Sequence, residues 1–243
     1  MSFLKKMQSA LGTGKPPAVT CPYCNATLDI EPDRKRKCPE CGKTIHPKRL
    51  HNEEQKRFVT DEEAARTDAA NEEHHRRKRV ADLEQRLKDA QKSKNRYEEA
   101  VAHALIEAEA GNVDRAWGYY NQALKETMKG NQMGMYRCTK FDMSMLLKQE
   151  GRHKNAPVLL SEVCYLDYCE YHGLTTPVFA PGVLGEIRLA MKRSGTDMTA
   201  FRETFISMTQ QVSAVKTRHP PIQAWQALET ALRELDSRPK GAA

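Results

Sequence analysis

Four cysteines near the N-terminus form two closely spaced pairs of potential metal ligands. Each pair has the pattern Cys-Pro-x-Cys, and thirteen residues separate the two pairs. Such a pair places two thiolates on one tight turn, and two facing turns supply the four soft ligands of a closed tetrahedral zinc site. The spacing therefore predicts one structural Zn²⁺ held by Cys21, Cys24, Cys38 and Cys41.

The residues around these pairs predict a small β-hairpin. Asn25 and Gly42 follow the second cysteine of each pair, where the chain often needs the positive φ that both residues tolerate. Residues 27–31 alternate like a short half-buried strand, Pro32 begins a turn, and residues 34–38 return the chain. Two such turns joined by a hairpin resemble a zinc ribbon over roughly residues 19–47. The resemblance implies a fold but no function, because zinc ribbons contact nucleic acids, dock proteins or only stabilise structure.

Positive charge is concentrated in the cysteine-bearing segment. Residues 1–57 hold twelve Lys and Arg against six Asp and Glu, whereas residues 97–243 hold seventeen of each. A negatively charged partner is therefore expected only at the N-terminal segment. If that partner is DNA or RNA, an aromatic ring would stack on a base and cations would meet phosphates; the candidate residues are Tyr23, Arg34, Lys35, Arg36, Lys37 and Lys43.

A long charged helix is expected after the cysteine module. Thr60 and Glu63 form a capping box, and no Pro or Gly follows until Gly111, so the helical potential covers about fifty residues. Residues 80–108 repeat apolar positions at alternating three- and four-residue steps, which is a coiled-coil period. Self-association through this seam and packing within one chain explain the pattern equally well.

A glycine followed five positions later by an alanine recurs three times in the C-terminal half. The glycines are Gly111, Gly151 and Gly195, and each would end a helix so that the alanine lets the next helix pack closely. The pattern resembles the tetratricopeptide repeat, most clearly in residues 104–124, which implies stacked antiparallel helix pairs. Because the spacings of 40 and 44 exceed the family's usual 34, a generic helical array stays open.

The C-terminal half also contains two apolar stretches expected in its core. A last helix opening at Pro221 carries an apolar stripe formed by Trp225, Leu228, Leu232 and Leu235. Tyr165, Tyr168 and Cys169 would line either the core or a peptide groove, and we favour the core. The cysteines outside the pairs, Cys138, Cys164 and Cys169, are expected to be buried reduced thiols.

The predicted fold is mainly α, with a small zinc ribbon, a long linking helix and a tetratricopeptide-like domain. The expected domains are an N-terminal helix and linker at 1–18, the ribbon at 19–50, the charged helix at 58–96 and the repeats at 97–243. No apolar run reaches the length of a membrane span, and with the reduced thiols this indicates a cytoplasmic protein.

The sequence favours an interaction protein over an enzyme. It contains no metalloprotease motif, nucleophile elbow or nucleotide-binding loop. The leading hypothesis is a zinc-binding adaptor whose helical repeats bind a protein partner while the ribbon docks elsewhere. The alternative is a nucleic-acid-binding protein that contacts DNA or RNA through the basic residues of 1–57.

Overall fold

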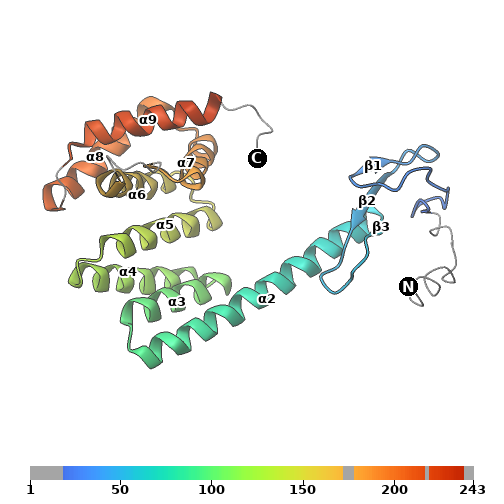
Figure 1. Ribbon diagram of the computed structural model, residues 1–243, viewed down its shortest axis with the longest axis horizontal. Coiled ribbons are helices and arrows are strands. Elements are labelled where there is room, and N and C mark those ends of the chain that lie inside the picture. Colours follow the sequence, from blue (N-terminus) through green and yellow to red (C-terminus); the bar gives the residue numbers. More distant parts are fainter. Residues whose placement is uncertain (1–18, 172–177, 217–218, 238–243) are drawn as a thin grey trace, which may run out of the picture. The chain divides into compact units, whose positions relative to one another are not determined.

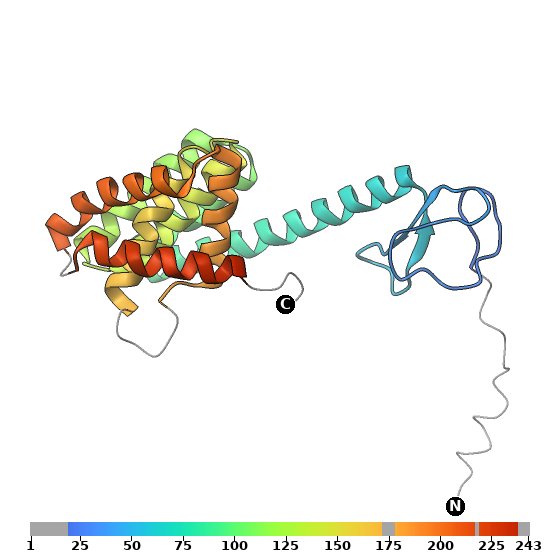
Figure 2. The same ribbon diagram turned by 90° about the horizontal axis from the view of Figure 1, so that it is seen from above.

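The computed structural model describes residues 19–171, 178–216 and 219–237 (Figures 1 and 2). Mainly helical, it divides into two compact units, Met1–Arg79 and Val80–Ala243. The expected N-terminal helix and linker at 1–18 lie outside the described residues. No helix in the described ranges has both the length and the apolar character needed to cross a bilayer.

A three-stranded antiparallel sheet forms the first unit together with the cysteine turns. Its strands are β1 (Arg36–Lys37), β2 (Thr44–Lys48) and β3 (Arg57–Val59), in the order β1-β2-β3 (Figure 1). Side chains alternate between the faces of a strand, so the neighbours Ile45 and His46 on β2 point to opposite sides. Ile45 joins a small core with Leu28 and the buried cysteines.

The strand predicted over residues 27–31 is wrong. Thr27 makes only an isolated bridge with Thr20, and Ile30 remains 68% exposed because nothing in the described part covers it. β1 pairs instead with β2, so the hairpin encloses the second cysteine turn rather than linking the two turns. β3 also carries the sheet beyond residue 50, where the ribbon was expected to end.

Helix α2 (Asp61–Ser93) begins at the predicted capping box. The Thr60 backbone N–H donates to the Glu63 carboxylate at 3.0 Å, and the Glu63 N–H donates to the Thr60 hydroxyl at 3.3 Å. The helical potential of about fifty residues is interrupted, however, because the chain turns at Lys94, whose φ is 56°. Asn95 then starts α3 (Arg96–Glu109), its side-chain oxygen accepting from the Glu98 N–H at 3.1 Å.

This turn divides the apolar seam of residues 80–108 between two helices. On α3, Tyr97 and Val101 pack against Ala123 within the same chain. On α2, Val80, Leu83 and Leu87 are only half-buried. The α3 half is therefore intramolecular packing, and self-association through the α2 half remains a prediction.

The second unit begins as a stack of helices and ends as a cluster around one of them. α3, α4, α5 and α6 each pack against the next in sequence, as Figure 1 shows, whereas α7, α8 and α9 all contact α6. Nine consecutive residues from Leu160 to Tyr168 on α6 are buried, so α6 is the centre of the largest core. The bounds are α4 (Val113–Lys129), α5 (Met133–Gln149), α6 (Ala156–Tyr171), α7 (Pro181–Ser194), α8 (Met198–Lys216) and α9 (Pro221–Ser237).

Two of the three glycine–alanine units follow the prediction in full. Gly111, Gly151 and Gly195 all have positive φ, between 69° and 78°, and Ala116 and Ala156 are fully buried. Ala200 is exposed, so the prediction that the third alanine packs against the preceding helix is wrong by one position. Phe201 is the buried residue there, because α8 turns Phe201, Phe205 and Thr209 toward the core at four-residue steps.

The other core expectations are mostly confirmed. Tyr165 and Tyr168 are buried in the main core, and so are Trp225, Leu228 and Leu232 on α9. Cys164 is fully buried and Cys169 is half-buried. Cys138 is exposed on α5, so the expectation that it is buried is wrong.

Candidate metal centre and the start of helix α2

The four cysteines of the Cys-Pro-x-Cys pairs come together in one cluster. Their sulfurs all lie within 4.8 Å of one another. The Cys21 and Cys41 sulfurs are 3.8 Å apart, and so are those of Cys24 and Cys38. Four sulfurs arranged tetrahedrally at about 2.3 Å from one zinc would be separated by about 3.8 Å. The cluster therefore has the donor type, number and spacing to hold a metal ion of this size.

The two cysteine turns share the same backbone geometry. The N–H of Asn25 donates to the Cys21 carbonyl, and the N–H of Gly42 donates to the Cys38 carbonyl, both at 2.9 Å. Asn25 has φ 60° and Gly42 has φ 70°, which confirms the predicted left-handed positions. Each turn thus directs its two sulfurs to the same side, and the two turns meet sulfur to sulfur.

The thiols perturb one another strongly. Burial by itself would raise the pKa of Cys21, but hydrogen bonds from the backbone of Tyr23 and Cys24 outweigh burial and lower it to about 7. For Cys24 the backbone of Ala26 acts to lower the pKa, yet burial and the neighbouring thiols raise it to about 12. Neighbouring thiols cannot all ionise to thiolates without a compensating cation. A divalent metal would supply that positive charge.

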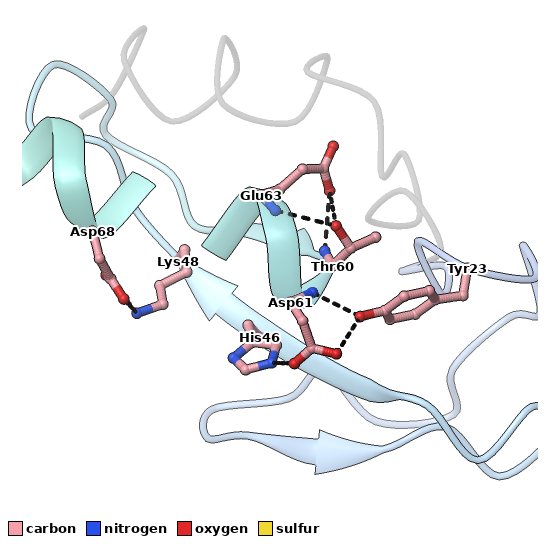
Figure 3. Close-up of polar contacts among 7 residues, drawn as sticks. All are labelled: Tyr23, His46, Lys48, Thr60, Asp61, Glu63 and Asp68. Atoms are coloured by element: carbon pink, nitrogen blue, oxygen red, sulfur yellow. Dashed lines mark hydrogen bonds and ion pairs between the residues drawn. The ribbon is translucent and has the colours of Figure 1, made fainter. Parts of the chain in front are cut away.

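His46 lies outside the thiol cluster and contacts the first residue of α2 instead. Its side chain, 8% exposed, places Nε2 2.6 Å from Asp61 Oδ1. Since His46 follows Cys41 by only five residues, its residue type and position would also suit a substitute metal ligand. The structure shows a buried histidine on β2 that tethers the start of a helix (Figure 3).

Tyr23, inside the first cysteine turn, binds the same residue of α2. Its hydroxyl donates to Asp61 Oδ2 at 2.8 Å and accepts from the Asp61 backbone N–H at 2.7 Å (Figure 3). The Lys43 ammonium lies 4.9 Å from the centre of the Tyr23 ring. Tyr23, which the sequence offered for base stacking, is therefore already engaged at its hydroxyl and over a face of its ring.

The remaining candidate nucleic-acid contacts are exposed cations. Arg34, Lys35, Arg36, Lys37 and Lys43 are all exposed, and none makes an ion pair within the described residues. Nearby cations behave differently. Lys48 pairs with Asp68 at 2.5 Å, as Figure 3 shows, and Lys56 pairs with Asp33 at 3.2 Å.

Sequence reasoning missed a second candidate site, an apolar groove in the helical unit. It is a cavity of about 310 Å³ lined by residues of α4, α5, α6 and α8, namely Met128, Met133, Tyr136, Lys140, Glu162, Met208, Gln211 and Val212. The available signal was compositional, because five of the ten methionines fall between residues 128 and 145. Nothing local in the sequence shows that Met208 joins them.

Comparisons with known proteins return nothing: no protein-family model matches the chain, and neither do curated proteins or solved structures. The thiol cluster, the exposed cations and the groove are therefore the features of this chain that bear on its function.

Proposed function

We propose that this chain is a zinc-binding interaction protein of the cytoplasm, without enzymatic activity, whose helical unit binds a protein partner. The observation that carries the proposal is the methionine-lined groove. Met128, one of its lining residues, is 55% exposed, so part of this apolar lining is open to solvent. Flexible, polarisable methionines are common on surfaces that bind apolar peptide segments.

The polar residues of the groove favour an apolar occupant over a charged one. Lys140 pairs with Glu162 at 2.9 Å, and the Tyr136 hydroxyl donates to the same carboxylate at 2.7 Å. These charges are already compensated, so the described lining of the groove offers no free charge to recruit an ionic small molecule. The volume of the groove is at the lower end of the range found for ligand-binding pockets. A groove of this size suits a few apolar side chains of a peptide.

The groove is tested by changing its methionines in the full chain and capturing partners from native lysate. Met128→Gln with Met208→Gln should abolish the capture of the partner, because both substitutions place amides on the apolar lining. Met135→Gln is the matched control, since Met135 is 36% exposed on α5 but does not line the cavity. A partner retained by the double variant, or lost equally in the control, would refute the groove as the binding surface.

Zinc is proposed as the metal of the thiol cluster because four thiolates in a closed tetrahedral arrangement are typical of structural zinc. Elemental analysis of the purified chain should find one zinc per molecule. Cys38→Ser should lose it, and Cys138→Ser, which changes an exposed cysteine far outside the cluster in sequence, should keep it. Another metal, or zinc in both variants, would contradict the assignment.

A second candidate function is nucleic-acid binding by the first unit, favoured by five exposed cations around β1 that make no ion pair with any described residue. Binding of the full chain to DNA or RNA should weaken steeply with salt, because phosphate contacts release counterions. Arg34→Glu with Arg36→Glu should reduce both the affinity and the salt dependence. Arg66→Glu is the control, because Arg66 already pairs with Glu62 on α2. Retention of the protein partner after nuclease treatment separates this function from the first.

A further inference from the structure

The start of α2 is held by Tyr23 of the first cysteine turn as well as by local contacts. Helix N-termini leave backbone N–H groups without partners inside the helix. Thr60 satisfies the N–H of Glu63 through the capping box. The N–H of Asp61 is satisfied by Tyr23, 38 residues earlier in the chain, between Cys21 and Cys24.

The Asp61 side chain is held from two directions. The Tyr23 hydroxyl binds one carboxylate oxygen and His46 of β2 binds the other (Figure 3). These contacts, the one with Tyr23 first, lower the pKa of Asp61, as expected of a carboxylate stabilised by donors. The first helical residue is thus bound to a cysteine turn and to the central strand of the sheet.

We propose that metal occupancy of the thiol cluster controls the first turn of α2 through the contact between Tyr23 and Asp61. This inference rests on the metal binding proposed above. The metal then does more than stabilise the ribbon, because its presence decides whether a long helix begins at Asp61 with its capping contacts complete.

The physical reason is that the position of Tyr23 depends on the sulfurs on either side of it. The first cysteine turn is otherwise held by backbone hydrogen bonds such as those from Asn25 and Cys21, and by the N–H of Tyr23, which lies 3.5 Å from the Cys21 sulfur. The Tyr23 ring also packs against the small core, but that core itself contains the ligands Cys21 and Cys38. A module with so small a core is rarely ordered without its metal. When the first cysteine turn loses its shape, the Tyr23 hydroxyl moves away from Asp61. The start of α2 then loses both the donor to the Asp61 carboxylate and the acceptor of the Asp61 N–H.

Thermodynamic linkage makes this coupling reciprocal. If metal binding strengthens the Tyr23–Asp61 contact, then that contact must strengthen metal binding by the same factor. Removing only the hydroxyl, by Tyr23→Phe, therefore has two measurable consequences, one at the metal and one at the helix.

The first measurement is the zinc dissociation constant of the full chain, obtained by competition with a chromogenic chelator. Tyr23→Phe should raise it roughly tenfold, because hydrogen bonds to charged groups are among the stronger ones. Tyr119→Phe is the matched control, since Tyr119 lies half-buried on α4 and stacks on His103. An unchanged constant in Tyr23→Phe, or an equal rise in both variants, overturns the proposal.

The second measurement follows the amides of Asp61 and Ala64 by NMR hydrogen exchange in the wild-type chain, with zinc and after its removal by a chelator. The N–H of Ala64 makes the first backbone bond of the helix, to the Thr60 carbonyl at 2.9 Å. Both amides should exchange faster without zinc, while amides in the middle of α2 stay protected.

The outcomes separate this inference from the metal site on which it rests. A chain that binds zinc but shows no change at Asp61 and Ala64 overturns the coupling and leaves the zinc site standing. A chain that binds no metal overturns both. Because the second measurement uses the wild-type protein, a variant that fails to fold does not weaken the test.

Discussion

Asp142 is a half-buried carboxylate of α5 with no ion-pair or hydrogen-bond partner among the described residues. Burial raises its pKa to about 6, although Arg86 and Arg137 act to lower it. Both arginines are bound to other carboxylates, Arg86 to Glu98 at 2.5 Å and Arg137 to Asp167 at 2.7 Å. The charge of Asp142 is therefore only partly compensated when it ionises.

Asp142→Asn should stabilise the helical unit at pH 7. The folded-state pKa lies above the unfolded value of about 3.9, so the folded state holds the proton more tightly and stability falls as pH rises from about 4 to 6. The variant avoids that loss, so its free energy of unfolding at pH 7 should exceed that of the wild-type chain by up to about 2 kcal/mol. This difference should shrink toward pH 4. Urea unfolding at several pH values, followed by the fluorescence of Trp117 and Trp225 in the second unit, measures this difference. A gain independent of pH would contradict this explanation.

The turn between α2 and α3 shows what local sequence signals omit. Lys94 takes a left-handed conformation without being Gly or Asn, and the Asn95 N–H bonds back to the Ala90 carbonyl at 2.9 Å. Tyr97 and Val101 must bury against α4, and this tertiary packing outweighs the helical propensity of the segment. The only local sign is Asn95, a good N-cap residue.

Asn95→Ala should destabilise the second unit by about 1 kcal/mol, because it removes the side-chain acceptor of the Glu98 N–H. Asn121→Ala, at an exposed interior position of α4, is the control and should be neutral or slightly stabilising because alanine is the better helix former. Urea midpoints of the two variants give the comparison. Equal midpoints would mean that packing alone fixes the break between the two helices.

At the scale of elements, features encoded over a few residues were predictable and contacts distant in sequence were not. The cysteine turns, the capping box of Thr60 and the helix-ending glycines each have a short signature, and the structure confirms them. The bond from Tyr23 to Asp61 joins residues 38 apart and follows from neither residue's surroundings. The strand at 27–31 failed for the same reason, since alternation says nothing of whether a partner strand is present.

At the scale of the whole molecule, the chain consists of two units with separate cores. Among the described residues, the core of the first unit consists of Cys21, Leu28, Cys38 and Ile45, and two of these four residues are candidate metal ligands. The second unit buries a much larger apolar set around α6. The first unit should therefore depend on its metal for folding, and the second should not.

Cys38→Ser should unfold the sheet and the cysteine turns of the first unit and leave the second unit intact. Loss of one thiolate removes metal binding and with it most of the folding free energy of the small unit. Helicity measured by circular dichroism should fall only by the part that α2 loses, and the fluorescence of Trp117 and Trp225 should not change, because both lie in the second unit. Cys138→Ser should alter neither signal. A collapse of both signals in Cys38→Ser would instead show that the two units fold as one cooperative body, with α2, which contains residues of both, transmitting the loss.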